Sequence, residues 1–480
     1  MLADAEAALT KVTGPAVPPD YDALSLLLDV STEKLGRAWG AVGHLNSVAD
    51  TPELRAAYNE NLPRITEFYT RLGADERLYA KYKALNAAQQ GLPAAQQLSP
   101  ARHKALDNAL RGFVLGGAEL QGAAKERFAA IQEEQAAKSQ AFSEHVMDAT
   151  DAYAYYATAD ELAGVPQDVI DATRAAAEAE GKDGHKLTLH MPSYLPVMQY
   201  ASHRPLRETM YRAYVTRASE FGPTERDNSP LMREIVGLRQ EESKLLGYDS
   251  FAQVSLVPKM ATSPEQVMDF LLDLAQRARP YAEKDMAELR EFAQTECGLS
   301  DLQAWDVAFV SEKLKEARYA FSDQEVKQYF TEPTVLQGLF GLIEQLFDVQ
   351  IQPDTAPVWH ESERFFRIER AGALVGQFYL DPYARPGKRP GAWMDDVRGR
   401  WLRPDTGTTQ TPVAHLVCNF AKGVGDKPAL LTHDDVTTLF HEFGHGLHHM
   451  LTQVDDIGVA GISGVEWDAV ELPSQFMENF

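Results

Sequence analysis

The feature that most restricts the fold of this 480-residue chain is the sequence His-Glu-Phe-Gly-His, which begins at His441. On a helix, residues four apart lie one turn apart on the same side, so His441 and His445 can reach one tetrahedral metal ion. Glu442 would then lie beside the metal, where its carboxylate can accept a proton from a water molecule. Thr432 and Asp435 form a capping pattern ahead of an apolar stripe, which predicts a helix here. The motif therefore predicts a metal centre built on a helix.

A catalytic zinc needs three protein ligands and one open position, so a third ligand is expected downstream. The acidic candidates are Asp455, Asp456, Glu466, Asp468, Glu471 and Glu478. The glycine-rich segment that follows Asp456 predicts a turn, and a second helix is expected to begin near Glu466 to Asp468. Asp468 and Glu471 are then three residues apart on one face. We assign Glu471 to the metal, and Asp468 to the free ring nitrogen of a ligand histidine.

Most of the chain outside this region predicts helix. One helical face is marked by the spacing of Leu106, Leu110, Phe113 and Val114. The segment from about Ala101 to Met147 is rich in Ala, Glu, Gln, Lys and Leu and contains no proline. It predicts one or two long helices, interrupted at Gly116-Gly117.

Strand patterns concentrate in a segment just before the metal-binding motif. Phe365–Ile368 and Ala373–Leu380 predict a hairpin that turns at Gly372, and Val413–Phe420 predicts a third strand. We hypothesise that a substrate backbone adds to the Val413–Phe420 strand, a binding mode that tolerates varied side chains.

The most basic stretch of the chain lies between the hairpin and the third strand. It contains Arg385, Lys388, Arg389, Arg398, Arg400 and Arg403. These charges are either solvated or paired internally, or they attract a substrate carboxylate.

A change in the types of residue near residues 181–200 predicts a boundary between two mainly helical regions. A polar turn, EGKDGHK, is followed there by two prolines, short apolar runs and aromatic residues. We therefore divide the chain into an N-terminal helical region, residues 1–190, and a catalytic region, residues 191–480.

Composition excludes several classes of protein. The formal charge is −24, from 46 basic and 70 acidic residues, so a role in nucleic-acid binding is not expected. No apolar run reaches the roughly 18 residues of a membrane span, and the N-terminus does not resemble a secretory signal. Cys297 and Cys418 are far apart in the sequence, which favours reduced thiols and a cytoplasmic location.

Other histidines near the motif have simpler interpretations. His433 is expected to contact the start of the metal helix. His448 shares the face of His441 and His445, and it is either structural or a group that contacts the substrate or a metal ligand. His449 and His415 are expected to be structural or exposed.

The metal-binding motif and the segments around it resemble those of a known family. HEFGHGLHHML, followed by GISGVEWDAVELPSQFMEN, resembles the thimet oligopeptidase family of zinc peptidases, in particular its bacterial oligopeptidase A branch. The similarity extends upstream through FYLDPYARPGKRPGAWMDD, TPVAHLVCNFAKG and WDVAFVSEKLKEARYAF. The resemblance implies that His441, His445 and Glu471 hold one Zn²⁺ and that Glu442 is the catalytic base.

The same resemblance implies the fold class. It is a mainly α, two-lobed helical zincin-type metallopeptidase, with a small β-sheet beside the HExxH helix. A deep, narrow substrate channel between the lobes admits short peptides and excludes folded proteins.

The chain departs from the family at its ends. Family members continue well beyond the third ligand, in a stretch that supplies tyrosine and histidine groups to the substrate. This chain ends at Phe480, nine residues after Glu471, and its start is also shorter. We therefore expect the catalytic region to be incomplete at its C-terminus, with weaker zinc binding and slower hydrolysis than a full-length version.

The expected function is that of a zinc-dependent endopeptidase, a monomer that hydrolyses short oligopeptides with Glu442 as general base. One alternative is a peptidyl-dipeptidase of the same family, which would share every metal residue. A second alternative, for these 480 residues alone, is a non-catalytic zinc-binding protein.

Overall fold

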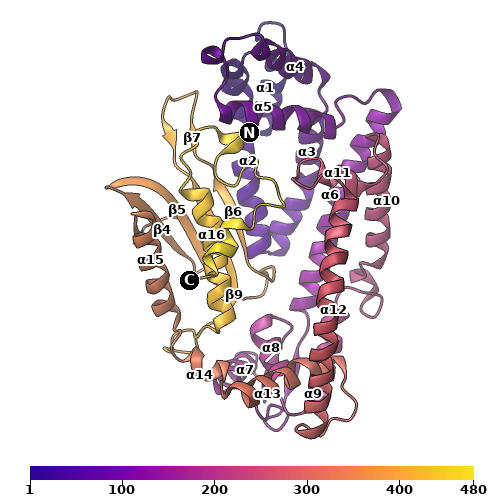
Figure 1. The fold of residues 1–480 in the computed structure, drawn as a ribbon, viewed down its shortest axis with the longest axis vertical. Coiled ribbons are helices and arrows are strands. Elements are labelled where there is room, and N and C mark those ends of the chain that lie inside the picture. The colour runs from indigo at the N-terminus through magenta and orange to yellow at the C-terminus, as the bar shows by residue number, and fades with distance from the viewer.

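The computed structural model describes residues 1–480 in full and is mainly helical (Figure 1). The N-terminal helices gather at one end of the molecule, and the longer ones among them run down from it. Their bounds are α1 Leu2–Val12, α2 Tyr21–Val48, α3 Pro52–Gly73, α4 Glu76–Gln90, α5 Pro100–Leu115 and α6 Gly122–Asp151.

The helical prediction for residues 101–147 is confirmed, together with its interruption. α5 and α6 cover this segment, and the chain turns between them at Gly116 and Gly117. A Cβ on Gly116 would lie 2.8 Å from the carbonyl oxygen of Gly73, and Gly117 has φ +81°. Both positions need glycine, the first for close approach to the end of α3 and the second for its left-handed backbone.

The middle of the chain forms the far end of the molecule and one of its two sides. Its elements are β1 Tyr155–Ala157, α7 Gln167–Ala179, β2 His185–Leu187, α8 Met191–Tyr200, α9 Arg204–Val215, α10 Ser229–Leu245, α11 Phe251–Leu256, α12 Pro264–Thr295, α13 Val307–Tyr319 and α14 Asp323–Lys327. The segment expected to hold a boundary contains β2, which pairs antiparallel with β1, and the whole of α8. The division at residues 190 and 191 stays a prediction.

The opposite side of the molecule carries the sheet and the predicted metal helix (Figure 1). Its elements are α15 Glu332–Phe347, β3 Gln350–Pro353, β4 Arg364–Arg370, β5 Ala373–Tyr383, β6 Trp393–Arg398, β7 Trp401–Leu402, β8 Thr409–Gln410, β9 Val413–Phe420, α16 His433–Met450 and α17 Leu472–Met477. The predicted hairpin is therefore confirmed as β4 and β5, and the predicted third strand as β9.

The sheet has the strand order β3-β4-β5-β9-β6. β9 pairs parallel with β5 on one side and antiparallel with β6 on the other. The hypothesis that a substrate adds to β9 is therefore wrong, because both of its edges are already hydrogen-bonded. β6 forms the edge of the sheet on this side. This strand order could not be predicted from the sequence, because β6 lies in the basic loop and lacks a clear alternation of apolar and polar residues.

A hydrophobic core fixes α16 against this sheet. Phe443 on α16, Phe378 on β5 and Phe340 on α15 contact one another as part of a larger buried cluster. Phe443 and Phe378 are fully buried, and each buried aromatic side chain of this size contributes roughly 1.5–3 kcal/mol. The orientation of α16, and therefore of its polar face, is set by this packing.

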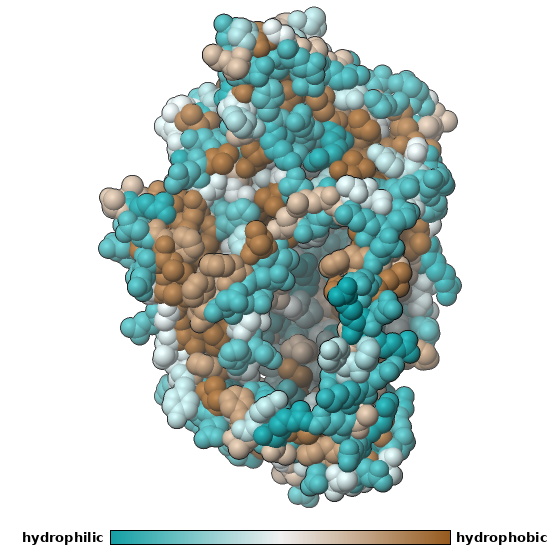
Figure 2. All heavy atoms as spheres, viewed as in Figure 1, coloured by the Kyte–Doolittle hydropathy of each residue, from teal (hydrophilic) through white to brown (hydrophobic).

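The two sides of the molecule face each other across a hollow (Figure 2). In Figure 1, α12 runs along one side of this space and α16 along the other. The expected two-lobed, mainly helical architecture with a small sheet and a channel is thus confirmed. No helix has the length and apolarity required to cross a membrane.

Candidate metal centre

The helix that carries the motif starts as its sequence predicts. Thr432 precedes α16 and forms a capping box with Asp435. The Thr432 hydroxyl accepts a hydrogen bond from the Asp435 backbone N–H at 3.1 Å, and the Asp435 carboxylate accepts from the Thr432 N–H at 2.8 Å. These bonds satisfy two N–H groups that a helix start leaves without partners.

Close packing sets the position of α16 relative to the sheet. A Cβ on Gly446 would lie 2.9 Å from the Leu416 side chain of β9, so the glycine lets α16 pack closely against this strand. The apolar face of α16 is buried, whereas the His441 and His445 side chains keep 25% and 13% of their surface exposed. The two imidazoles are therefore held rigidly while their ring nitrogens stay accessible.

The structure brings both histidines to one carboxylate oxygen. Nε2 of His441 lies 3.2 Å from Oε2 of Glu471, and Nε2 of His445 lies 3.1 Å from the same atom. The three ligand atoms lie within 4.8 Å of one another. Bonds of about 2.0–2.2 Å to a tetrahedral zinc place ligand atoms about 3.3–3.5 Å apart, so these residues fit such an ion.

Glu471 reaches this place from the end of a turn rather than from within a helix. The expectation of a helix beginning near Glu466 to Asp468 is wrong, because turns occupy this stretch and α17 begins at Leu472. The turns depend on glycine: Gly461 has φ +62°, and a Cβ there would lie 2.9 Å from the His449 backbone. Glu466 anchors the segment to α5 through Lys104, with 2.5 Å between Nζ and Oε1.

Gly444 explains how Glu471 can come so near to α16. A Cβ at Gly444 would lie 2.5 Å from the Pro473 carbonyl oxygen and 2.5 Å from Cα of Ser474. The lack of a side chain at Gly444 therefore admits the start of α17 next to α16. Ser474 in turn donates a hydrogen bond from its hydroxyl to Oε2 of Glu471 at 2.8 Å, which restrains the carboxylate.

The structure does not bring Asp468 to either histidine. Its carboxylate accepts hydrogen bonds from the backbone N–H groups of Met260 and Ala261, at 2.9–3.0 Å. Glu478 takes the expected place instead, with Oε1 2.7 Å from Nδ1 of His441. Asp468 lies before the true start of α17, so it does not share a helical face with Glu471. Glu478 follows Glu471 by seven residues and lies just beyond the short helix α17, and its place among the acidic candidates after the motif is the signal that could have identified it.

Glu442 lies next to this centre in a buried position. It is 5% exposed, and its Oε2 atom has no hydrogen-bond partner. Burial raises the pKa of the Glu442 carboxyl to about 7, with His441 lowering it and Glu471 raising it further. Burial likewise lowers the pKa of His445, which favours the neutral imidazole that a metal requires.

The remaining histidines do not join the centre. His433 is exposed at the first turn of α16, and His449 is fully buried with Nε2 3.1 Å from the Arg398 carbonyl oxygen. His415 is buried and stacks on His44, with ring centroids 3.6 Å apart. His448 is half-buried, and burial lowers its pKa. The structural interpretation holds for His449 and His415.

Most charges of the basic loop are paired internally. Lys388 is fully buried and binds Asp381, with 2.9 Å between Nζ and Oδ1, and Arg385 binds the same carboxylate at 2.7 Å. Arg403 pairs with Glu33 on α2 at 3.1 Å. Ion pairing within the fold therefore accounts for these three cations.

Comparison with known proteins identifies the family of this chain. Residues 197–480 match the model described as Peptidase family M3, and residues 1–125 match that of the Neurolysin/Thimet oligopeptidase N-terminal domain. Oligopeptidase A of Salmonella typhimurium is 47% identical over 484 residues, which cover all of this chain and 70% of that protein. Oligopeptidase A of Escherichia coli is 46% identical with the same coverage. Dipeptidyl carboxypeptidase of Salmonella typhimurium is 29% identical, over 98% of this chain and 68% of that protein.

Solved structures share the fold at low identity. PZ peptidase A bound to an inhibitor superimposes with a TM-score of 0.55 and 14% identity, over 99% of this chain and 66% of that one. A putative oligoendopeptidase F from Bacillus anthracis gives a TM-score of 0.52 and 15% identity, over 99% and 69% of the two chains. The matched families and the extent of identity lead to one conclusion: the chain belongs to peptidase family M3, a family of metallopeptidases.

Proposed function

We propose that this protein is a zinc-dependent oligopeptidase, in which His441, His445 and Glu471 hold the metal and Glu442 is the general base. The observation that carries the proposal is the convergence of two imidazole nitrogens on one Glu471 oxygen, at 3.1 and 3.2 Å. Two imidazoles and a carboxylate suit zinc and leave a fourth position for substrate or water. Zinc bound there would polarise the scissile carbonyl group and activate a water molecule for attack.

The residues of the chain supply the proton transfers. Glu442 follows His441 directly on α16, and its buried Oε2 has no partner within the protein, so it is free to accept a proton from the attacking water. Glu442 then delivers that proton to the leaving amine. Glu478 accepts a hydrogen bond from Nδ1 of His441, so that Nε2 presents its lone pair to the metal.

The edge of the sheet offers a way to orient an extended peptide. β6 lies at the end of the strand order and close to α16. A peptide that pairs with β6 would be recognised through hydrogen bonds to its backbone, a mode of binding that is compatible with varied side chains. The hollow between the two sides limits access to chains that are unfolded or short (Figure 2). Short peptides are therefore the proposed substrates.

Endopeptidase action is favoured over the release of dipeptides. The relatives named oligopeptidase A are 46–48% identical to this chain, whereas those named dipeptidyl carboxypeptidase are 28–29% identical. Cys297 and Cys418 are both free thiols, which supports the proposed cytoplasmic location. The monomeric state and the absence of nucleic-acid binding stay predictions.

The test is the product pattern from one defined peptide of about ten residues, analysed by mass spectrometry with and without zinc. The proposal predicts internal cleavage that a chelator abolishes and added zinc restores. Serial loss of C-terminal dipeptides would instead identify a peptidyl-dipeptidase. Cleavage that survives complete zinc removal would contradict the proposed mechanism.

A further inference from the structure

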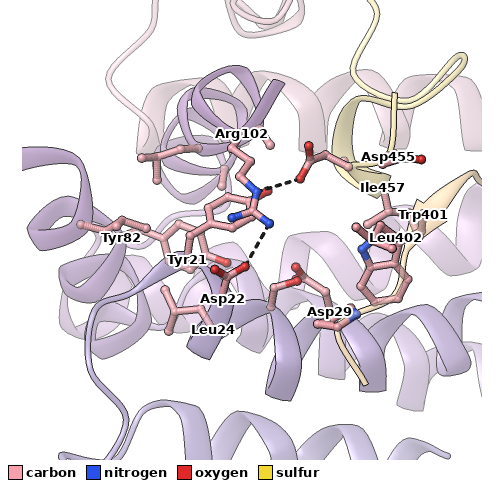
Figure 3. Close-up of a pocket in the computed structure, with 18 residues that line it drawn as sticks. Tyr21, Asp22, Leu24, Asp29, Tyr82, Arg102, Trp401, Leu402, Asp455 and Ile457 are labelled. Atoms are coloured by element: carbon pink, nitrogen blue, oxygen red, sulfur yellow. Dashed lines mark hydrogen bonds and ion pairs between the residues drawn. The ribbon is translucent and has the colours of Figure 1, made fainter. Parts of the chain in front are cut away.

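A second cavity lies between the N-terminal helices and the segment that follows α16 (Figure 3). Its volume is about 240 Å³, and no residue of the metal centre lines it. Side chains of α2, α4 and α5 form one wall, and residues 401–404 and 455–458 form the other. Ligand pockets for drug-sized molecules occupy about 300–1,000 Å³, so this cavity suits a smaller molecule.

Four carboxyl groups and one guanidinium line the cavity, and three of the four carboxyls are already paired. Arg102 binds Asp22 at 3.0 Å and Asp456 at 3.2 Å, so its charge is balanced within the wall. Asp455 binds Arg400 at 2.7 Å. The charge of Arg102 is therefore not available to attract an anion into this cavity.

The fourth carboxyl, that of Asp29, has no ion-pair partner. Ser25, one turn earlier on α2, is its hydrogen-bonding neighbour, and burial raises the pKa of the Asp29 carboxyl. Asp29 lines this cavity and also the wall of a neighbouring hollow between α2 and β6. A carboxyl group that is partly withdrawn from water without gaining a cation costs free energy, and a bound cation would offset that cost.

Aromatic rings complete the lining. Tyr21, Tyr82 and Trp401 surround the same space as Asp29 (Figure 3). The Arg102 guanidinium lies 4.8 Å from the centre of the Tyr21 ring, so one face of this ring already contacts a cation of the protein. Burial, followed by the neighbouring carboxyls, raises the pKa of Tyr21, so its hydroxyl stays neutral. Rings and an unpaired carboxyl together suit a cation with an apolar stem.

We propose that this cavity binds a small organic cation, a guanidinium or primary ammonium group on a short aliphatic chain. Asp29 balances its charge, and the rings of Tyr21, Tyr82 and Trp401 pack against its stem. This site is separate from the metal centre, and the proposal does not depend on peptidase activity. The cation would also contact the chain segment between α16 and Glu471.

The test is isothermal titration of the protein with n-butylguanidinium and with N-butylurea, a neutral molecule of nearly the same shape. The proposal predicts that the guanidinium binds at least about tenfold more tightly than the urea, since a charge-assisted hydrogen bond contributes that much. Asp29→Asn should weaken guanidinium binding by at least about tenfold and leave urea binding unchanged. Asp269→Asn, at an exposed position on α12, is the matched control and should bind as the wild type does.

A second variant addresses the cavity without changing its charge. Ala109→Leu adds three carbon atoms to the α5 wall and should abolish binding of both probes by filling the space. This variant decides the question if Asp29→Asn does not fold. Equal affinity for the two probes would overturn the proposal. Wild-type affinity in either Asp29→Asn or Ala109→Leu would overturn it as well.

Discussion

Oε1 of Glu478 lies 2.7 Å from Nδ1 of His441, behind the imidazole whose other nitrogen faces Glu471. A carboxylate in this place fixes the tautomer of a ligand histidine and increases its basicity. Glu478→Gln should therefore weaken zinc binding by about 10- to 100-fold, measured by competition with a chromophoric chelator. The melting temperature of the zinc-free variant should stay close to that of the zinc-free wild type, because the substitution acts on the metal ligand and not on the fold.

Asp468→Asn is the matched comparison, because the sequence alone assigns this role to Asp468. Its carboxylate binds the backbone at Met260 and Ala261, so the amide should leave zinc affinity within about twofold of wild type. A larger loss of zinc affinity in Asp468→Asn than in Glu478→Gln would show that Asp468, and not Glu478, orients the ligand histidine.

Gly444→Ala tests the close contact between α16 and α17. The added Cβ would lie 2.5 Å from the Pro473 oxygen, so α17 must move and carry Glu471 away from the histidines. We expect weaker zinc binding and a lower melting temperature. Gly338→Ala on α15 is the control, since its Cβ meets nothing within 4 Å and alanine favours a helix by about 0.5–1 kcal/mol. Unchanged zinc affinity in Gly444→Ala would show that the contact is not required.

A buried ion pair should dominate stability at the far end of the molecule. Asp306 is fully buried and binds Arg207, which is 1% exposed, at 2.7 Å. Asp306→Asn leaves this guanidinium without its counter-charge and should lower the free energy of unfolding by about 3–5 kcal/mol. Glu208→Gln, which breaks the exposed pair with Arg212, should cost less than about 1 kcal/mol. Urea denaturation of both variants would check this, and equal losses would be contrary to it.

Glu363 should make stability depend on pH. Burial raises the pKa of this carboxyl from an ordinary 4.5 to about 8, so the folded protein holds a proton that the unfolded chain releases. Stability linked to this group is present below pH 4.5 and is lost as the pH rises towards 8. Glu363→Gln keeps an acceptor for the Trp359 N–H and removes the titration. The melting temperature of Glu363→Gln, relative to that of wild type, should therefore rise between pH 5 and pH 8. A difference in melting temperature that does not change with pH would show that Glu363 does not titrate in this range.

The sequence predicts those parts of this fold that depend on local patterns. The capping box at Thr432, the break at Gly116-Gly117 and the bounds of β9 follow from residues that are neighbours in the chain. The relation of His441 to His445 is equally local, because a helix fixes it. Each of these features is confirmed by the structure.

Features that depend on packing between distant segments escape such patterns. The strand β6 lies in a loop whose cations mask its alternation, so the position of β9 inside the sheet was not predicted. Glu478 replaces Asp468 because α17 begins at Leu472, and that start is set by turns anchored on α5. The sequence does not show that Asp29 lines a cavity, because residues 401–404 and 455–458, which are distant in the chain, form the wall opposite α2.

The most direct test of the central claim compares wild type with Glu442→Gln at matched zinc content, on one internally quenched fluorescent peptide. An amide cannot accept the proton of the attacking water, and loss of a positioned general base costs typically 100- to 10,000-fold. If Glu442 is the base, both proteins should hold about one zinc per chain, and the variant should hydrolyse the peptide at least about 100-fold more slowly. Equal hydrolysis by the two proteins would show that Glu442 is not the base.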